Sequence, residues 1–274
     1  RQRQMCIRDS SIYEVAMDNL SVGLDPNKIT LVQQSRIPSI GELTVFYSML
    51  VSVNSLRHNP TIKTEAANYG YNDMTYGFLG YPVSQSADIT FCKANLVPVG
   101  EDQKPHMEMT RKIVRRFNEL YGETLVEPDM MLSDCPRLMG LDGNAKMGKS
   151  LGNAIYLSDP AEEVRKKVMS AVTDASRIKK DDPGHPDICV VSKYHKVFNA
   201  GEYENICESC KKGAIGCVAC KKALAASLND LLEPFREKRA YYEAHRDEVR
   251  DIILTGSEKA NKIGNETVKE VKEA

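Results

Sequence analysis

A loop with two lysines carries the residues of this chain best suited to chemistry on a phosphate. Residues 143–150 have the sequence Gly-Asn-Ala-Lys-Met-Gly-Lys-Ser. This segment matches the Walker A pattern GxxxxGK[ST], in which backbone amides and a lysine hold the phosphates of a nucleotide. The pattern predicts contact with a nucleotide through Lys146, Met147, Gly148, Lys149 and Ser150.

The surroundings of this loop do not favour a P-loop nucleotidase. A P-loop follows a buried strand and opens a long helix whose amides bind phosphate. Residues 136–141 have a poor strand pattern, and residues 151–157 have a poor helix pattern. A P-loop NTPase is therefore the less favoured alternative, and a solvated lysine loop is the simplest one from this segment alone.

Five of the eight cysteines lie in one short stretch, which suggests a metal site. They are Cys189, Cys207, Cys210, Cys217 and Cys220. In a protein of the cytoplasm such a cluster favours metal binding over disulfides. The set Cys207-x2-Cys210-x6-Cys217-x2-Cys220 has the four thiolates of a tetrahedral Zn²⁺ site.

Strands and helices alternate in the first half of the chain, which predicts an α/β fold that would position these residues. The apolar pattern predicts, in order, a helix at 11–22, a strand at 29–32, a helix at 37–53, a helix near 81–92, a strand at 96–99 and a helix with Asp102 as its N-cap that ends near 121. The turn at 100–102 lies between a strand and a helix, where open α/β sheets bind ligands.

The strand pattern disappears beyond residue 158. Helices are expected at 190–199, 219–232, 234–254 and 257–274, and Asp159-Pro160 with Glu162 predicts one more helix start. We therefore expect an α/β catalytic domain at 10–157 and an all-helical domain at 158–274. Residues 1–9 have no hydrophobic period and are expected to be a non-native leader.

Composition excludes several classes of protein. The chain has 274 residues, of which 42% are apolar and 27% charged, as in globular rather than disordered proteins. Its net charge of −1 means that a nucleic-acid partner must be bound by local basic patches. Because no apolar run approaches the roughly 20 residues of a membrane span and no secretory signal is visible, we expect a cytoplasmic protein without a membrane partner.

Several motifs resemble those of bacterial tryptophanyl-tRNA synthetases, which are class I aminoacyl-tRNA synthetases. Residues 81–89, Tyr-Pro-Val-Ser-Gln-Ser-Ala-Asp-Ile, are similar to the helix that lines the family's amino-acid pocket. Residues 97–103, Val-Pro-Val-Gly-Glu-Asp-Gln, follow it, and residues 146–150 resemble the KMSKS loop with Gly148 in place of serine. Further agreement comes from residues 22–26, 34–38 and 256–260. The resemblance extends from Ser11 to Ala274.

The resemblance implies a Rossmann-like parallel sheet followed by a helical domain that recognises the anticodon. It also implies an ATP-dependent ligase that joins L-tryptophan to tRNA(Trp) through a tryptophanyl-adenylate, with Mg²⁺ accompanying ATP. Lys146 and Lys149 would meet the charge that builds on pyrophosphate as the amino-acid carboxylate attacks ATP. Enzymes of this family are homodimers, so the resemblance implies a homodimer as well.

The resemblance further implies roles for single residues. Asp88 would accept the indole N–H of tryptophan, Gln85 would lie in the same pocket, and Gln103 would help hold the substrate's polar end. The residues expected at ATP, besides the lysine loop, are Gly100, Glu101, Asp102 and Leu138.

For the cysteines the resemblance implies a second ligand set. Cys189-x20-Cys210-x6-Cys217-x2-Cys220 resembles the arrangement by which some members of the family hold a [4Fe–4S] cluster near the anticodon-binding region. Four thiolates serve either centre, so ligand type does not choose between them. Cys207 belongs to the zinc set and Cys189 to the cluster set, and we favour the cluster.

The chain departs from the family pattern in two respects. The family usually has methionine and alanine where this chain has Gln85 and Ser86, which predicts a more polar indole pocket. The HIGH-type motif is missing, and no histidine stands in an H-x-G-H context, whether His58, His106, His185, His195 or His245. We therefore expect an N-terminally truncated synthetase, and a non-catalytic tRNA-binding fragment is the alternative.

Overall fold

The chain forms two compact units, each assembled from two separate parts of the sequence. The structure is a computed structural model that describes residues 2–71, 73–132, 138–144, 147–148 and 151–274. Unit 1 comprises Arg1–Asp25 and Cys135–Val249, and unit 2 comprises Pro26–Asp134 and Arg250–Ala274. The two units therefore interleave along the sequence, unlike the two consecutive domains expected from it.

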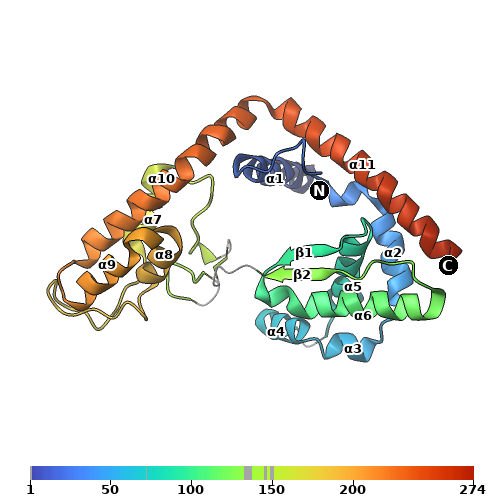
Figure 1. The fold of residues 1–274 in the computed structure, drawn as a ribbon, viewed down its shortest axis with the longest axis horizontal. Coiled ribbons are helices and arrows are strands. Elements are labelled where there is room, and N and C mark those ends of the chain that lie inside the picture. Colours follow the sequence, from blue (N-terminus) through green and yellow to red (C-terminus); the bar gives the residue numbers. More distant parts are fainter. Residues whose placement is uncertain (1, 72, 133–137, 145–146, 149–150) are drawn as a thin grey trace. The chain divides into compact units, whose positions relative to one another are not determined.

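Unit 2 contains a parallel pair of strands with helices around it (Figure 1). Strand β1 (Leu96–Val99) pairs with β2 (Asp129–Leu132), with Leu96 opposite Asp129 and Val99 opposite Leu132. The helical segments are η1 (Gln34–Arg36), α2 (Pro38–Ser48), α3 (Val53–Arg57), α4 (Pro60–Tyr69), α5 (Tyr76–Thr90), η2 (Glu101–Gln103), α6 (Lys104–Tyr121) and all but the first turn of α11 (Arg246–Glu273). A parallel sheet with helices is the class predicted from the sequence.

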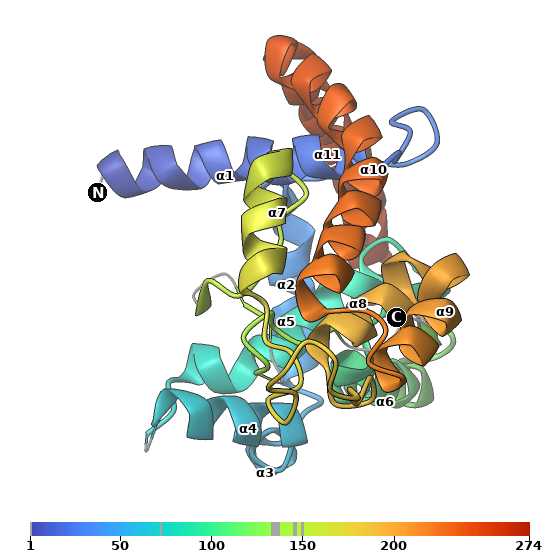
Figure 2. The same ribbon diagram turned by 90° about the vertical axis from the view of Figure 1, so that its left-hand side faces the viewer.

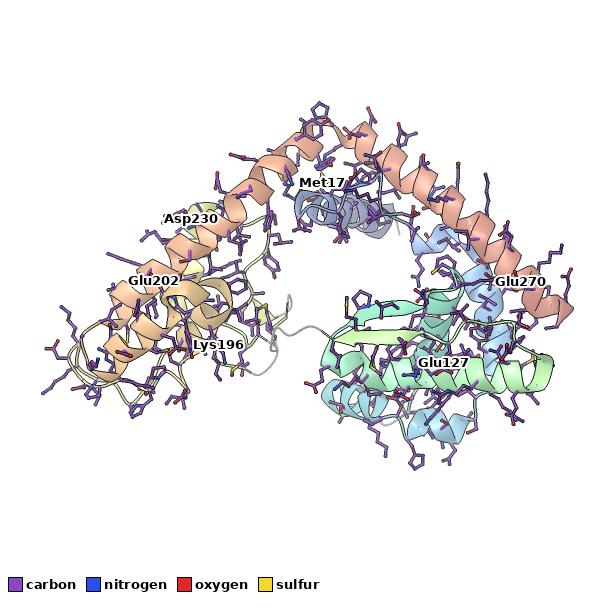
Figure 3. All side chains as sticks on the ribbon, viewed as in Figure 1. Met17, Glu127, Lys196, Glu202, Asp230 and Glu270 are labelled. Carbon is purple, nitrogen blue, oxygen red and sulfur yellow. The ribbon has the colours of Figure 1, made fainter. Side chains whose placement is uncertain are left out.

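The core of unit 2 lies where α5 packs against α2 and α6. Leu43, Val83 and Ile113 are almost completely buried there, and α11 adds Val268. Buried apolar side chains of this size each stabilise a fold by roughly 1.5–3 kcal/mol. Helix α11 is also tied to the end of α5, because Lys93 pairs with Glu270 at 2.5 Å (Figure 3).

Two arginines of α6 hold the segment that leads into β2. Glu127 accepts hydrogen bonds from Arg111 Nε at 2.9 Å and Arg115 Nε at 2.8 Å (Figure 3). These guanidinium groups lower the pKa of Glu127 to about 2. The carboxylate therefore stays charged throughout the physiological range, and the short second strand is fixed to a helix.

Unit 1 is helical. Its helices are α1 (Gln2–Ser21), α7 (Ala161–Ser170), α8 (Val190–Phe198), α9 (Ala200–Lys211) and α10 (Cys217–Ala244), together with the first turn of α11. Helix α7 lies beside α10 (Figure 2), and their shared core contains Val164, Val168 and Leu228. Helix α1 also packs on α10, where Met17 is fully buried.

A buried arginine joins α1 to α10. Arg239 makes ion pairs with Glu14 and Asp18 of α1 and with Glu243 of its own helix, the last at 3.1 Å. A guanidinium that is largely removed from water needs such partners, because an unpaired buried charge is costly. The N-terminal helix is therefore fixed by charge as well as by apolar packing.

Several predicted elements differ from the structure. Residues 29–32 are not a strand, the expected helix at 37–53 is divided into α2 and α3, and α1 begins earlier than residue 11. Pro234 does not end a helix, because α10 continues through it. Asp102 is not the N-cap of α6, since it lies inside η2. Within the described part of the chain, no helix has both the length and the apolar character that a bilayer span requires.

Candidate active site

A row of polar side chains follows one face of α5. Tyr81, Gln85 and Asp88 are spaced four and three residues apart, so they lie on the same side of the helix. The side chains of Leu79 and Val83 are buried in the core instead. Helix α5 therefore separates an apolar face from a polar one, as expected for a helix that lines a binding pocket.

The polar row is joined to the turn after β1. Gln85 Nε2 donates to Gln103 Oε1 at 3.0 Å, and Gln103 Nε2 donates to Asp102 Oδ2 at 3.3 Å. Gly100, Glu101 and Asp102 follow directly at the carboxyl end of the strand, where parallel sheets bind ligands. The structure therefore brings together Gln85, Gln103 and Asp102, which the resemblance placed at the amino acid and beside ATP.

The contacts of Tyr81 with Glu65 and His106 were not predicted from the sequence. Tyr81 Oη donates to Glu65 at 3.0 Å and lies 3.2 Å from His106 Nε2. Because its one proton goes to the carboxylate, Nε2 must carry the hydrogen of the imidazole and donate to the phenol. Burial lowers the pKa of His106, which agrees with a neutral ring. Burial, followed by Glu65, raises the pKa of Tyr81, so the phenol stays protonated.

Ser86 does not make the pocket more polar. Its side chain is completely buried, where Oγ donates to Pro82 O and accepts from Thr110 Oγ1, both at 2.9 Å. The hydroxyl therefore forms its hydrogen bonds within α5 and with α6. Gln85, by contrast, is on the polar row, so the expected increase in polarity rests on that residue.

Asp88 has a defined partner in the short helical segment η1. Its Oδ1 accepts a hydrogen bond from Gln34 Nε2 at 2.6 Å. Burial raises the pKa of Asp88 from its ordinary value of 3.8, and the bond from Gln34 opposes that shift. A half-buried carboxylate of this kind suits a neutral N–H donor such as an indole.

The lysine loop belongs to unit 1, and an asparagine fixes its base. Lys146, Lys149 and Ser150 lie outside the described residues, whereas Met147 and Gly148 are described. Gly148 N donates to Asn153 Oδ1 at 2.9 Å. The Asn153 amide in turn donates to Asp142 Oδ1 at 3.0 Å, which holds both ends of the loop. A P-loop would require a strand directly before the loop and a long helix directly after it. Neither is present among the described residues around this loop.

Asn153→Ala is expected to lower the stability of the protein by about 1 kcal/mol, the net value of a typical hydrogen bond, because Asp142 is exposed and Gly148 half-buried, so water can partly replace the lost partner. Its side chain is buried and connects Gly148 with Asp142. The midpoint of urea unfolding measures the change. Asn205→Ala is the matched control, because Asn205 is exposed on α9 and its side chain donates to neighbouring Glu202 of the same helix. Equal midpoints for both variants would show that the Asn153 side chain does not stabilise the loop.

Leu138, expected beside adenine, lies on the segment that leads into this loop. It is half-buried, and the next carbonyl, Met139 O, accepts a hydrogen bond from Tyr194 Oη at 2.8 Å. Burial raises the pKa of Tyr194 to about 12, so it remains a donor at every relevant pH. The backbone around Leu138 is thereby fixed to α8.

The five clustered cysteines occupy one region of unit 1 but are not arranged as a metal site. Arg177 Nη1 lies 3.7 Å from Cys210 Sγ and 3.9 Å from Cys217 Sγ. Burial raises the pKa of the Cys220 thiol to about 12, and the other four thiols add to the shift. Among the described residues, which include all five, no three His, Cys, Asp or Glu side chains are placed to hold a metal ion. The predicted assembled cluster or zinc site is therefore not supported by the geometry.

Comparison with known proteins assigns the family. The sequence pattern of the family "tRNA synthetases class I (W and Y)" matches residues 3–233. The chain belongs to this family of class I aminoacyl-tRNA synthetases. Tryptophan--tRNA ligase of Streptococcus mutans is 48% identical over 277 residues, which cover 98% of this chain and 81% of that protein.

Solved structures agree with this assignment. The crystal structure of tryptophanyl-tRNA synthetase from Campylobacter jejuni complexed with ADP and tryptophan has a TM-score of 0.82 and 27% identity, covering 100% of this chain and 84% of that one. The tryptophanyl-tRNA synthetase of Mycoplasma pneumoniae has a TM-score of 0.76 and 25% identity, over 94% of this chain and 79% of that one. Both of these structures are of tryptophanyl-tRNA synthetases.

Proposed function

We propose that this protein is a tryptophan–tRNA ligase, which attaches L-tryptophan to tRNA(Trp) through a tryptophanyl-adenylate. The observation that carries the proposal is the polar face of α5, where Asp88 is half-buried and Gln85 bonds to Gln103. The relatives with this activity support it.

In the amino-acid pocket, Asp88 accepts the indole N–H of the substrate. Phenylalanine has no such donor, and a buried acceptor left unpaired disfavours it strongly. Gln85 and Gln103 are already joined to each other and present further amide groups to the polar end of the amino acid. The pocket therefore selects its substrate by hydrogen bonding as well as by shape.

In the adenylation step, the carboxylate of tryptophan attacks the α-phosphate of ATP, and the bond to pyrophosphate breaks. Gly100, Glu101, Asp102 and Leu138 would bind the nucleoside. Lys146 and Lys149, with Met147, Gly148 and Ser150 of the same loop, would bind the phosphates together with Mg²⁺. Because negative charge grows on pyrophosphate as it leaves, the lysines act mainly in the transition state.

We further propose that the helical residues 158–274 bind the anticodon of tRNA(Trp) and that the enzyme is a cytoplasmic homodimer. The basic residues Arg165 and Lys166 are exposed on α7, in this part of the chain. Sedimentation or light scattering on the purified protein measures the oligomeric state directly.

A tryptophan-dependent exchange of pyrophosphate into ATP tests the activity. Exchange that requires L-tryptophan is the expected result. ATP hydrolysis without tryptophan would favour a P-loop NTPase, and tRNA binding without exchange would favour a non-catalytic fragment.

For the cysteines we propose Cys189, Cys210, Cys217 and Cys220 as ligands of a [4Fe–4S] cluster, with zinc on Cys207, Cys210, Cys217 and Cys220 as the alternative. The support is the spacing in the sequence and the mutual proximity of the thiols in unit 1. Their side chains would have to turn toward a common centre, since they are not preorganised around one.

Iron retention is expected to distinguish the two sets of ligands. After anaerobic purification, Cys207→Ser should keep its iron and sulfide, whereas Cys189→Ser should lose both, because only the second residue is a cluster ligand. Iron and sulfide analysis and the visible spectrum measure this. Stoichiometric zinc that is lost with Cys207→Ser but kept with Cys189→Ser would establish the zinc site instead, and protein without either metal would refute both.

A further inference from the structure

The contact between Gln34 and Asp88 joins a segment that the proposed function does not yet use to the residue proposed as the indole acceptor. Gln34 lies in η1, just before α2, and Asp88 lies more than fifty residues later on α5. The 2.6 Å bond runs from the amide N–H of Gln34 to Oδ1 of the carboxylate. A charge-assisted bond of this length is stronger than one between neutral groups and fixes the direction of its acceptor.

Within the described part of the chain, Gln34 is the hydrogen-bond partner of the Asp88 side chain, so one carboxylate oxygen is left for a ligand. A carboxylate on a single torsion can turn, and each orientation presents a different lone pair. With Oδ1 held by Gln34, Oδ2 has a fixed direction. The same bond opposes the effect of burial on the pKa of Asp88, so it also favours the charged form that accepts an indole N–H.

Gln34 is itself held in place by α11. The preceding residue, Gln33, donates its backbone N–H to Ser257 Oγ at 2.9 Å, and Ser257 is buried. One residue earlier in the helix, a Cβ on Gly256 would lie 2.1 Å from Leu31 O. Only glycine allows the helix to approach this backbone so closely. On the other side, Ile37 anchors the segment in the core.

We infer that Gln34 is a positioning residue for the selection of tryptophan: it orients the carboxylate of Asp88 toward the indole N–H, and Gly256 and Ser257 of α11 hold it there. The inference rests on the proposed role of Asp88 in indole recognition. It gives the C-terminal helix a part in substrate choice without any contact with the substrate.

The test compares two ligands that differ at the indole nitrogen. L-tryptophan has the N–H, and L-3-benzothienylalanine has sulfur in its place with nearly the same shape. Calorimetric titration of the full chain gives the dissociation constant of each ligand and their ratio. Gln34→Ala is expected to reduce the preference for tryptophan about tenfold, the scale of a hydrogen bond to a charged group, and to leave the analogue unchanged.

Gln33→Ala is the matched control. In the described residues, the Gln33 side chain bonds to Ser35 and Arg36 rather than to the polar face of α5, so the ratio should stay at its original value. Gly256→Ala should reduce the ratio as Gln34→Ala does, because its new methyl group displaces Leu31. If Gly256→Ala does not fold, Ser257→Ala removes the acceptor for Gln33 with no added volume.

The outcomes distinguish the inference about Gln34 from the proposed role of Asp88 as the indole acceptor. A reduced ratio in Gln34→Ala but not in Gln33→Ala supports the inference. An unchanged ratio in Gln34→Ala together with a reduced one in Asp88→Ala overturns the inference and keeps Asp88 as the indole acceptor. An unchanged ratio in both overturns the role of Asp88 as well. Equal weakening of both ligands in Gln34→Ala would mean a structural role only, and it would also overturn the inference.

Discussion

Asp88→Ala is expected to weaken the binding of L-tryptophan by roughly 2 kcal/mol or more, because the indole N–H loses its acceptor on entering a site removed from water. Asp88→Asn should weaken it as well, since the remaining neutral acceptor also faces Gln34. The chain has no tryptophan of its own. The fluorescence of the ligand can therefore be titrated against a dark background.

The same site predicts a dependence on pH. Burial raises the pKa of Asp88 from 3.8, so tryptophan binding should be lost as the pH falls through that raised value, before an ordinary aspartate would titrate. Asp73→Ala, a change at an exposed position of the same unit, is the control and should titrate like the original protein. An unchanged affinity in Asp88→Ala would remove this residue from the pocket.

Lys149→Ala is expected to slow adenylate formation on the order of a hundredfold or more, as happens when one group that stabilises developing charge is removed. Tryptophan binding should change little, because the lysine is needed when pyrophosphate departs. Pre-steady-state adenylate formation and ligand fluorescence measure the two effects separately.

Lys166→Ala is the control for charge, since Lys166 is exposed on α7. It should retain the original rate. If Lys149→Ala forms adenylate as fast as Lys166→Ala, the lysine loop has only a structural role. Weakened tryptophan binding with a normal rate would instead place Lys149 in ground-state recognition.

Local patterns in the sequence predicted the parts of the fold that depend on local forces. Strand β1 and helix α6 agree with the expectation, because an apolar run, a turn and a long amphipathic period mark them clearly. The resemblance placed both Gln85 and Gln103 at the amino acid, and the structure adds the hydrogen bond between them. These features depend on residues within one or two neighbouring elements.

The remaining differences come from contacts between distant segments. Residues 29–32 have the composition of a strand, but this segment lies against α11 and does not pair with another strand in the described part of the chain. Gln33 N–H donates to Ser257 Oγ, and Leu31 O lies next to Gly256. Pro234 does not break α10 because it is exposed, so water can satisfy the carbonyl that loses its partner. The contact of Glu65 with Tyr81 has no signal in the sequence, since it joins α4 to α5 through side chains alone.

Unit 2 is assembled from two separate parts of the sequence, and this has a consequence for biosynthesis. Its core combines Leu43 and Ile113 with Val268 and Val271 of α11, and all of residues 135–249 are translated in between. Domains tend to fold as they leave the ribosome, beginning at the N-terminus. Unit 2 has to wait until α11 has been synthesised, and its apolar helices stay accessible to chaperones during that interval.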